Sequence, residues 1–163
     1  MYYNNDMNDF LLSLDFRSII ALAVALLLGA LVGLERSVAG KTAGMRTFAL
    51  VSMGSTLFVI IARMMVADFL GPDSADAILR VIASVITGIG FLGAGLIIFG
   101  NQEVKGLTTA AGLWVSAGIG VAVGMGFYLI SITAVLLTLF TLRVLWYIEH
   151  KAKEYTNTTN EKV

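Results

Sequence analysis

The 163-residue chain is 58% hydrophobic and only 13% charged, and its mean hydropathy is +0.87. A soluble domain carries about 25% charged residues, so this composition excludes a soluble globular fold and predicts an all-α, polytopic membrane bundle. The formal net charge of zero gives no reason to expect a nucleic-acid partner. The absence of cysteine and the single histidine, His150, exclude a disulfide, a thiolate metal site and a histidine-rich metal site within one chain.

Four apolar runs follow in chain order, at residues 16–34, 48–67, 78–99 and 108–148. The last would extend roughly 60 Å as one helix, at a rise of about 1.5 Å per residue, whereas the hydrocarbon core is about 30 Å thick. We therefore expect a break at Gly124-Met125-Gly126. The sequence thus predicts about five transmembrane helices.

Charge placement predicts the orientation of the bundle. The first loop carries Arg36, Lys41 and Arg46, and basic residues also follow the last helix, whereas the second loop is acidic. Because lysine and arginine mark the cytoplasmic side, we expect the N-terminus outside and the C-terminus in the cytoplasm. No signal peptide is expected at the N-terminus. Three regions are expected: a polar N-terminal segment at 1–15, a transmembrane domain at 16–149 and a polar cytoplasmic tail at 150–163.

Small residues at four-residue spacing predict how the helices pack. In lipid, helix association depends on close backbone approach at such residues. The fourth helix carries four in a row, so we expect it to be central; alternatively, its glycines line a narrow polar path. The first helix has Gly29 and Gly33, and the third has Ser84 with Gly88 and Gly90 with Ala94. The residues of the fourth helix are Gly112, Ser116, Gly120 and Gly124.

Two stretches of similar sequence suggest an internal repeat. Leu28-Gly29-Ala30 is matched by Leu92-Gly93-Ala94, and further along the chain the segment from Gly44 to Ala49 is matched by the segment from Gly106 to Ala111. We therefore expect two parallel hairpins, formed by helices one and two and by helices three and four, with a fifth helix added.

Charged residues at the helix boundaries need partners or headgroups. For Arg36, Lys41 and Lys105 the favoured interpretation is that the side chain reaches the headgroups. Glu35 gains nothing from anionic headgroups, so we expect a Glu35–Arg46 ion pair that fixes the first turn. The alternative is a cation or proton site that uses Glu35 with Glu103.

At the opposite side of the bundle, two arginines fall within or near apolar runs. An arginine in hydrocarbon costs about 2.5–3.5 kcal/mol, so Arg63 and Arg80 are expected to be paired or to reach the headgroups. Three aspartates nearby, Asp68, Asp73 and Asp76, could bind a hard divalent cation weakly. A solvated loop is the favoured interpretation, and no resident metal or cofactor is expected.

No motif for catalysis is found. The sequence has no G-x-S-x-G, no H-E-x-x-H and no phosphate loop with lysine, and His150 lies beyond the last helix. We therefore expect that the protein is not an enzyme.

Four stretches in this order resemble the MgtC/SapB family of bacterial inner-membrane proteins, over about residues 16–149. They are Leu28-Gly-Ala-Leu-Val-Gly-Leu-Glu35-Arg36, Ala43-Gly-Met-Arg46-Thr47, Gly88-Ile-Gly-Phe-Leu-Gly-Ala-Gly95 and Val104-Lys-Gly-Leu-Thr-Thr-Ala-Ala-Gly-Leu-Trp114. Many members add a soluble C-terminal domain, where this chain has a short polar tail. The resemblance carries over these motif positions, without a chemical role for any: Glu35, Arg36, Gly44, Arg46, Thr47, Gly93, Gly95, Gly106, Thr108, Thr109 and Trp114.

The resemblance implies a multi-pass protein of the bacterial plasma membrane, linked to growth in low Mg²⁺ and, in some pathogens, to virulence. The resemblance also implies a protein partner, because well-known virulence members of the family act by contacting other membrane complexes, including ATP synthase. The leading hypothesis is therefore a non-enzymatic regulator of Mg²⁺ or phosphate homeostasis, or of stress and virulence adaptation, that binds a membrane-protein partner. The alternative is a small homo-oligomeric transporter for a cation or a proton, and a homo-oligomer is expected in either case.

Overall fold

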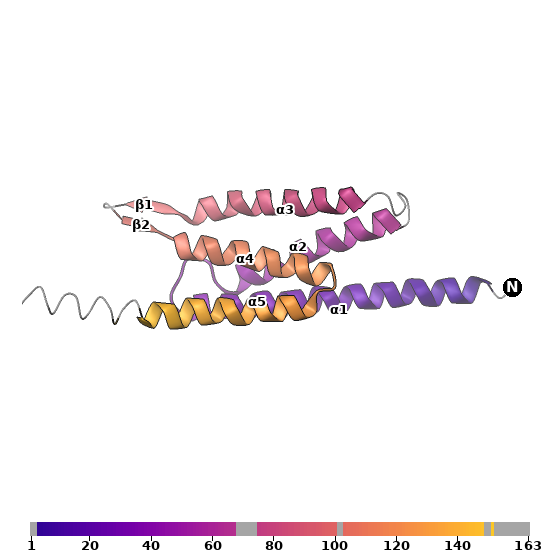
Figure 1. Cartoon of the computed structure of the whole chain (residues 1–163), viewed down its shortest axis with the longest axis horizontal. Coiled ribbons are helices and arrows are strands. Elements are labelled where there is room, and N and C mark those ends of the chain that lie inside the picture. The colour runs from indigo at the N-terminus through magenta and orange to yellow at the C-terminus, as the bar shows by residue number, and fades with distance from the viewer. Residues whose placement is uncertain (1–2, 68–74, 101–102, 149–150, 152–163) are drawn as a thin grey trace, which may run out of the picture.

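The computed structural model describes the backbone of residues 3–67, 75–100, 103–148 and 151, and their side chains except at 3–15 and 75. It contains the helices α1 (Tyr3–Val38), α2 (Met45–Met65), α3 (Ala75–Leu96), α4 (Leu107–Gly124) and α5 (Tyr128–Phe140). A π-helical turn, Thr141–Leu145, continues α5. Figure 1 shows the five helices running back and forth along one long axis. Each of the five helices belongs to an apolar span long enough to cross a bilayer, and the span of α5 continues through the π-helical turn to Ile148. This confirms the predicted membrane bundle.

The predicted break within the last apolar run is also confirmed. α4 ends at Gly124, and α5 begins at Tyr128. Between them, Gly126 has a φ of 86°, in the left-handed region that glycine adopts without strain. The chain can therefore reverse direction within three residues.

Two features of the backbone were not predicted. α1 begins at Tyr3, well before the apolar run that starts at Phe16. Between α3 and α4, strands β1 (Ile98–Gly100) and β2 (Glu103–Lys105) form an antiparallel hairpin with Phe99 opposite Val104. Three-residue strands leave too short an alternating pattern to distinguish them from a loop.

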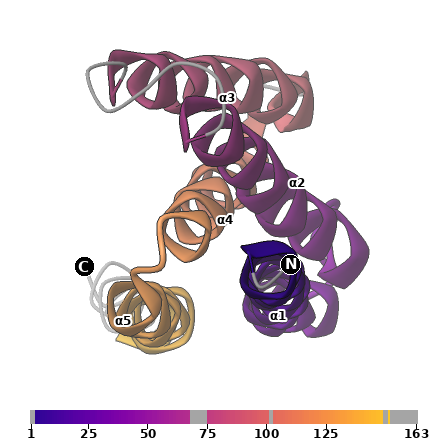
Figure 2. The ribbon, with the colours of Figure 1, turned by 90° about the vertical axis from the view of Figure 1, so that its right-hand side faces the viewer.

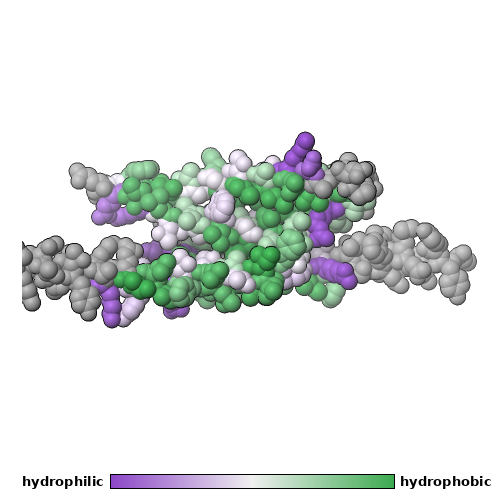
Figure 3. Space-filling view, viewed as in Figure 1, coloured by the Kyte–Doolittle hydropathy of each residue, from purple (hydrophilic) through white to green (hydrophobic). Residues whose placement is uncertain are grey.

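The hydropathy of the surface fits a bilayer. Figure 3 shows hydrophobic residues over the middle of the visible face and hydrophilic residues gathered toward its two ends. Large apolar side chains remain exposed along the helices, among them Leu129, Leu136 and Phe91. Such a surface is stable in lipid, because acyl chains are as apolar as the side chains themselves.

α4 lies at the centre of the bundle, as predicted. It contacts each of the other four helices, and the end-on view in Figure 2 shows α2, α3 and α5 arranged around it. Half of its span is buried, against 11% of the span in α3. The core consists of apolar residues that α1, α2, α4 and α5 bring together, including Val32, Phe48, Leu113, Ile119 and Val135.

The small residues predicted to pack α4 do so against α2. A Cβ added to Gly120 would lie 2.0 Å from the carbonyl oxygen of Ser52, and one added to Gly124 would lie 2.8 Å from the Cβ of Val59. Gly112 faces the ring of Phe48, and the hydroxyl of Ser116 donates a hydrogen bond of 2.9 Å to the carbonyl oxygen of Phe48. At Gly120 a larger side chain would require a helix backbone to move.

Gly29 and Gly33 give α1 the same close approach to α2. Added Cβ atoms would lie 2.6 Å from the carbonyl oxygen of Phe48 and 2.6 Å from the Cα of Met45, respectively. On α3, by contrast, an added Cβ at Gly88 or Gly90 would meet nothing within 4 Å. Gly88 and Gly90 therefore make no close helix contact within the described part of the chain.

The structure contains matching contacts in the two hairpins of the proposed repeat. Gly44 and Gly106 precede α2 and α4 directly as N-cap residues. Gly29 faces Phe48 in the first hairpin, and Gly93 faces Ala110, the corresponding pair, in the second. The second pair is looser, since the added Cβ at Gly93 would lie 3.7 Å from that of Ala110.

Candidate functional site

A cavity of about 1040 Å³ lies where α1 ends, α4 begins and α5 passes into its π-helical turn. Its wall is partly apolar, with Leu31, Leu34, Leu139 and Leu145 among the lining residues. Its polar lining residues come from three segments far apart in the sequence, and they include Glu35, Arg36, Lys41, Thr108, Thr109, Thr141 and Arg143. A cavity that combines an apolar wall with a few convergent polar groups is typical of a ligand site.

The structure corrects the predicted partner of Glu35. The ion pair joins the neighbouring residues Glu35 and Arg36, through Oε2 of the carboxylate and Nε of the guanidinium. Arg46 is exposed and makes no ion pair within the described residues. The reason is the position of Arg46 on α2, since Met45, Phe48 and Ala49 provide the surface that packs against α1.

The expectation that Arg36 reaches the headgroups is also wrong. Its residue is only 3% exposed, because α1 continues as a helix to Val38 and this side chain faces the cavity rather than the outer surface. Lys41 and Lys105 are exposed. Of the three expected headgroup residues, two are therefore free to reach water or headgroups and one is buried.

The β hairpin and Gly106 set the position at which α4 begins. Gly106 has a φ of 92°, and a Cβ there would lie 2.0 Å from the carbonyl oxygen of Leu96. Only glycine fits such a position. The hairpin thus returns the chain to α3 and places Thr108 and Thr109, in the first turn of α4, at the cavity.

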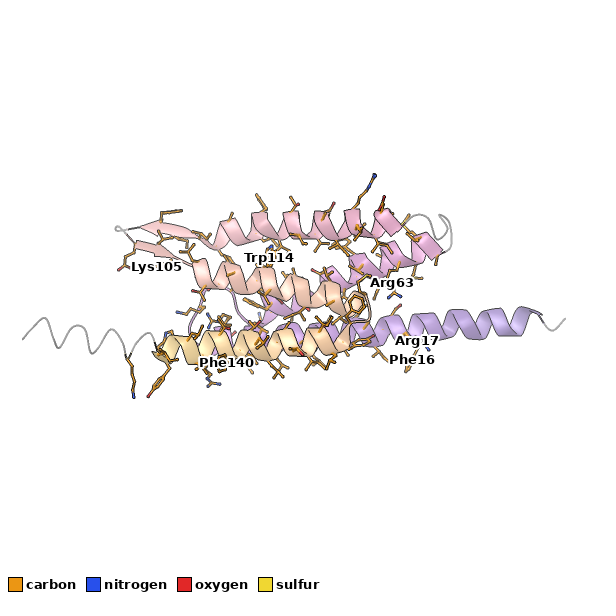
Figure 4. All side chains as sticks on the ribbon, viewed as in Figure 1. Phe16, Arg17, Arg63, Lys105, Trp114 and Phe140 are labelled. Carbon is orange, nitrogen blue, oxygen red and sulfur yellow. The ribbon has the colours of Figure 1, made fainter. Side chains whose placement is uncertain are left out.

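The other predicted motif residues lie outside this cavity. Gly44 and Thr47 flank the start of α2, where the hydroxyl of Ser37 accepts a hydrogen bond of 2.9 Å from the backbone N–H of Met45. Gly93 is buried against α4, and Gly95 has open space around it. Trp114 is 52% exposed on α4 (Figure 4).

The structure does not bring together Glu35 and Glu103, the two carboxylates considered as a cation or proton site. Glu103 lies on β2, where its carboxylate is 3.5 Å from the ammonium of Lys105, and it does not line the cavity that contains Glu35. Asp68 and Asp73 of the predicted acidic loop lie outside the described residues, whereas Asp76 is exposed at the start of α3. Among the residues that the structure describes, no three acidic or histidine side chains group as a metal site.

Arg63 has a partner that the sequence did not indicate. Its Nη1 donates a hydrogen bond of 2.9 Å to the carbonyl oxygen of Gly124, at the C-terminal end of α4, where cations interact favourably with the helix dipole. Figure 4 shows Arg63 and Lys105 toward opposite ends of the bundle.

A second hollow is an apolar groove of about 720 Å³ between α2 and α3. Its floor includes small residues from both helices, Gly54 and Ser55 from α2 and Ser84 and Gly88 from α3. Larger apolar side chains, such as Phe58 and Leu92, also line it, together with one charged residue, Arg80. Sequence reasoning identified the small residues of α3 but not the glycine of α2 that lies across from them.

Two cations of the cavity were also missed as site residues, namely Lys41 and Arg143. Arg143 was interpreted only as a marker of the cytoplasmic side, and Lys41 as such a marker and as a residue that reaches the headgroups. Arg143 lies far from the first loop in sequence, and only the packing of α5 against α1 brings it to the same cavity.

Comparison with known proteins places the chain among relatives of one family. The model of the MgtC family matches residues 22–151. YhiD of Escherichia coli K12, named as a candidate magnesium transporter, is 44% identical over 127 residues, which is 77% of this chain and 59% of YhiD. Protein SrpB of Synechococcus elongatus is 41% identical over 139 residues, covering 80% of this chain and 74% of SrpB. Protein MgtC of Salmonella typhimurium is 43% identical over 100 residues, covering 61% and 40%.

The chain thus spans about three-fifths of the length of YhiD and two-fifths of that of Salmonella MgtC. No solved structure shows a significant match.

Proposed function

The chain belongs to the MgtC family of multi-pass inner-membrane proteins, and from this premise we propose that it is a non-enzymatic regulator that binds another membrane protein. The process that it regulates is Mg²⁺ or phosphate homeostasis, or the adaptation to stress or to a host that depends on it. The name of YhiD, which refers to magnesium, supports the first of these.

The groove between α2 and α3 is the observation that carries this proposal. In the contacts of α2 with α1 and α4, Gly29, Gly33 and Gly120 lie directly against a neighbouring helix backbone. Gly54 and Gly88, which line the groove, would accept a Cβ with nothing within 4 Å. In a bilayer such residues allow a further helix to approach closely. The occupant that fits is one transmembrane helix of a partner protein.

The alternative function, transport of a cation or a proton, has less support from the geometry. The cavity at the end of α1 is lined by three cationic side chains and one carboxylate, and that carboxylate is already paired with Arg36. An excess of positive charge in a site of low dielectric constant repels a divalent cation. Partner binding is therefore the function that we favour.

Crosslinking from two positions of α3 tests partner binding. A photoreactive residue at Ser84 lies in the groove, whereas one at Thr87 does not. Both side chains are exposed and donate a 2.9 Å hydrogen bond to a carbonyl four residues earlier, so the two positions are well matched. In intact membranes we expect a discrete protein adduct from position 84 and none from position 87.

Two glycine variants decide whether that adduct matters. Gly88→Leu fills the groove, whereas Gly90→Leu adds the same side chain to the same helix outside it. We expect Gly88→Leu to abolish both the adduct and growth at low Mg²⁺, and Gly90→Leu to retain both. Adducts with lipid alone, adducts between copies of this chain alone, or equal behaviour of the two variants would each refute a heterologous partner in this groove.

A further inference from the structure

We propose that the cavity at the end of α1 binds a phosphate-bearing anion, supplied either by the headgroup of an anionic lipid or by a soluble phosphate ester. This site is distinct from the α2–α3 groove, with which it shares no lining residue. The inference therefore does not depend on the proposed partner. It assigns a ligand class to a cavity that the proposed function does not use.

The charges that line the cavity favour an anion. Arg36, Lys41 and Arg143 come from α1, the first loop and the π-helical turn, and Glu35 is the one carboxylate among the lining residues. Glu35 already accepts a hydrogen bond from Arg36. Lys41 and Arg143 form no ion pair with any described residue, so their charge is available to a ligand. Arginine and lysine together are the usual ligands of phosphate groups.

Arg36 provides the buried part of the site. Its side chain is only 4% exposed, yet among the described residues only its Nε has a hydrogen-bond partner. The terminal nitrogens of the guanidinium therefore keep unused donors on the wall of a cavity. These donors are available to a ligand in the cavity, and a phosphate oxygen would accept hydrogen bonds from them.

The start of α4 adds neutral donors to these cations. Gly106 supplies no side-chain cap, so the first backbone N–H groups of this long helix have no intrahelical acceptor. The residue Thr109 is 3% exposed and lines the cavity, and its hydroxyl has no hydrogen-bond partner among the described residues. Helix N-termini bind phosphate through these N–H groups and the helix dipole.

The rest of the wall is apolar and can accommodate the part of the ligand attached to the phosphate. Leucines from α1 and α5 face the same cavity, whose volume of about 1040 Å³ exceeds what an inorganic ion requires. Groups that bind phosphate beside an apolar wall suit a phospholipid, and they also suit a soluble phosphate ester with an apolar group. These two sources predict different results in a bilayer of controlled composition.

Trp146 lines the cavity and provides a local signal. Trp114 is the other tryptophan of the chain, so Trp114→Phe leaves Trp146 as the only indole fluorophore. We would place the full-length variant in phosphatidylcholine nanodiscs and follow its fluorescence in two arms. In the first, phosphatidylglycerol with brominated acyl chains replaces part of the lipid. In the second, inorganic phosphate and then glycerol phosphate are titrated against an equal ionic strength of chloride.

Charge variants show whether the signal arises from the site. Arg143→Gln and, separately, Lys41→Gln remove cavity cations, whereas Arg46→Gln removes an exposed cation outside the cavity. We expect a saturable response in one arm that is weakened roughly tenfold by Arg143→Gln or Lys41→Gln, as loss of one charge-assisted hydrogen bond implies. Arg46→Gln should leave it unchanged.

The arm that responds identifies the source of the phosphate. Quenching by brominated phosphatidylglycerol assigns a lipid headgroup, and a response to soluble phosphates in pure phosphatidylcholine assigns a soluble ester. The absence of a saturable response in both arms would overturn the proposal. A response that is as strong in Arg143→Gln and in Lys41→Gln as it is in Arg46→Gln would also overturn it.

Discussion

Single residues determine how closely the helices approach one another. The spacing of Gly112, Ser116, Gly120 and Gly124 was sufficient to predict a packing face, because small residues at i and i+4 lie on one side of a helix. It could not predict that α2 is the neighbour. Nor could it show that Arg36 is buried, since that depends on the position of α5, which contributes no residue near Arg36 in the sequence.

Replacement of Gly120 by alanine tests the closest contact in the bundle. The added methyl group would lie 2.0 Å from the backbone oxygen of Ser52, so α2 and α4 must separate. We expect a loss of about 1–3 kcal/mol in the free energy of unfolding, measured by SDS titration of the protein in mixed micelles. Gly118→Ala on the same helix meets nothing within 4 Å and should be neutral. Equal stability of the two variants would contradict the packing.

Arg63 should stabilise the end of α4 through its hydrogen bond to the carbonyl oxygen of Gly124. Arg63→Met retains the apolar stem of the side chain but removes this bond to a charged donor, so we expect a loss of about 1.5–3 kcal/mol. Arg80→Met is the control, since Arg80 is exposed and its guanidinium makes no hydrogen bond to a described residue. The same SDS titration should show little change for Arg80→Met. An Arg63→Met variant as stable as the unmodified protein would contradict a stabilising role for the Arg63 hydrogen bond.

At the scale of elements, hydropathy predicted the five helices and glycine chemistry predicted the turn after Gly124. Both are local properties of the chain, so one sequence suffices to find them. The β hairpin at 98–105 and the shallow burial of α3 were not predicted. They depend on how α3 meets the rest of the bundle, and a three-residue strand is too short to show an alternating pattern in its sequence.

Thr56 connects two elements and should stabilise their contact. Its hydroxyl lies 2.7 Å from the carbonyl oxygen of Gly120 on α4 and 3.1 Å from that of Ser52 on its own helix. Thr56→Val preserves the shape and removes the donor, and interhelical hydrogen bonds in membranes average about 0.6 kcal/mol. We expect a small but measurable loss of stability. Thr133→Val, which removes only a bond of 2.8 Å within α5, should show none, and a loss as large in this control would mean that the interhelical bond contributes nothing.

At the scale of the whole molecule, the bundle has two chemically different ends. One end gathers the cavity and the β hairpin, with Arg36, Lys41, Lys105 and Arg143 among its cations. The start of α3, with Asp76, lies at the other (Figure 1). From the rule that lysine and arginine face the cytoplasm, we expect the cavity to face the cell interior, where soluble phosphate esters and the anionic lipids of the inner leaflet would be available to it.

Cysteine labelling tests this arrangement most directly, because the chain has no cysteine of its own. Lys41→Cys and Asp76→Cys place one exposed thiol at each end of the bundle. With a maleimide that does not cross the membrane, we predict that intact spheroplasts label Asp76→Cys at once and label Lys41→Cys only after permeabilisation. Labelling of Lys41→Cys in intact spheroplasts, with protection of Asp76→Cys, would contradict the account.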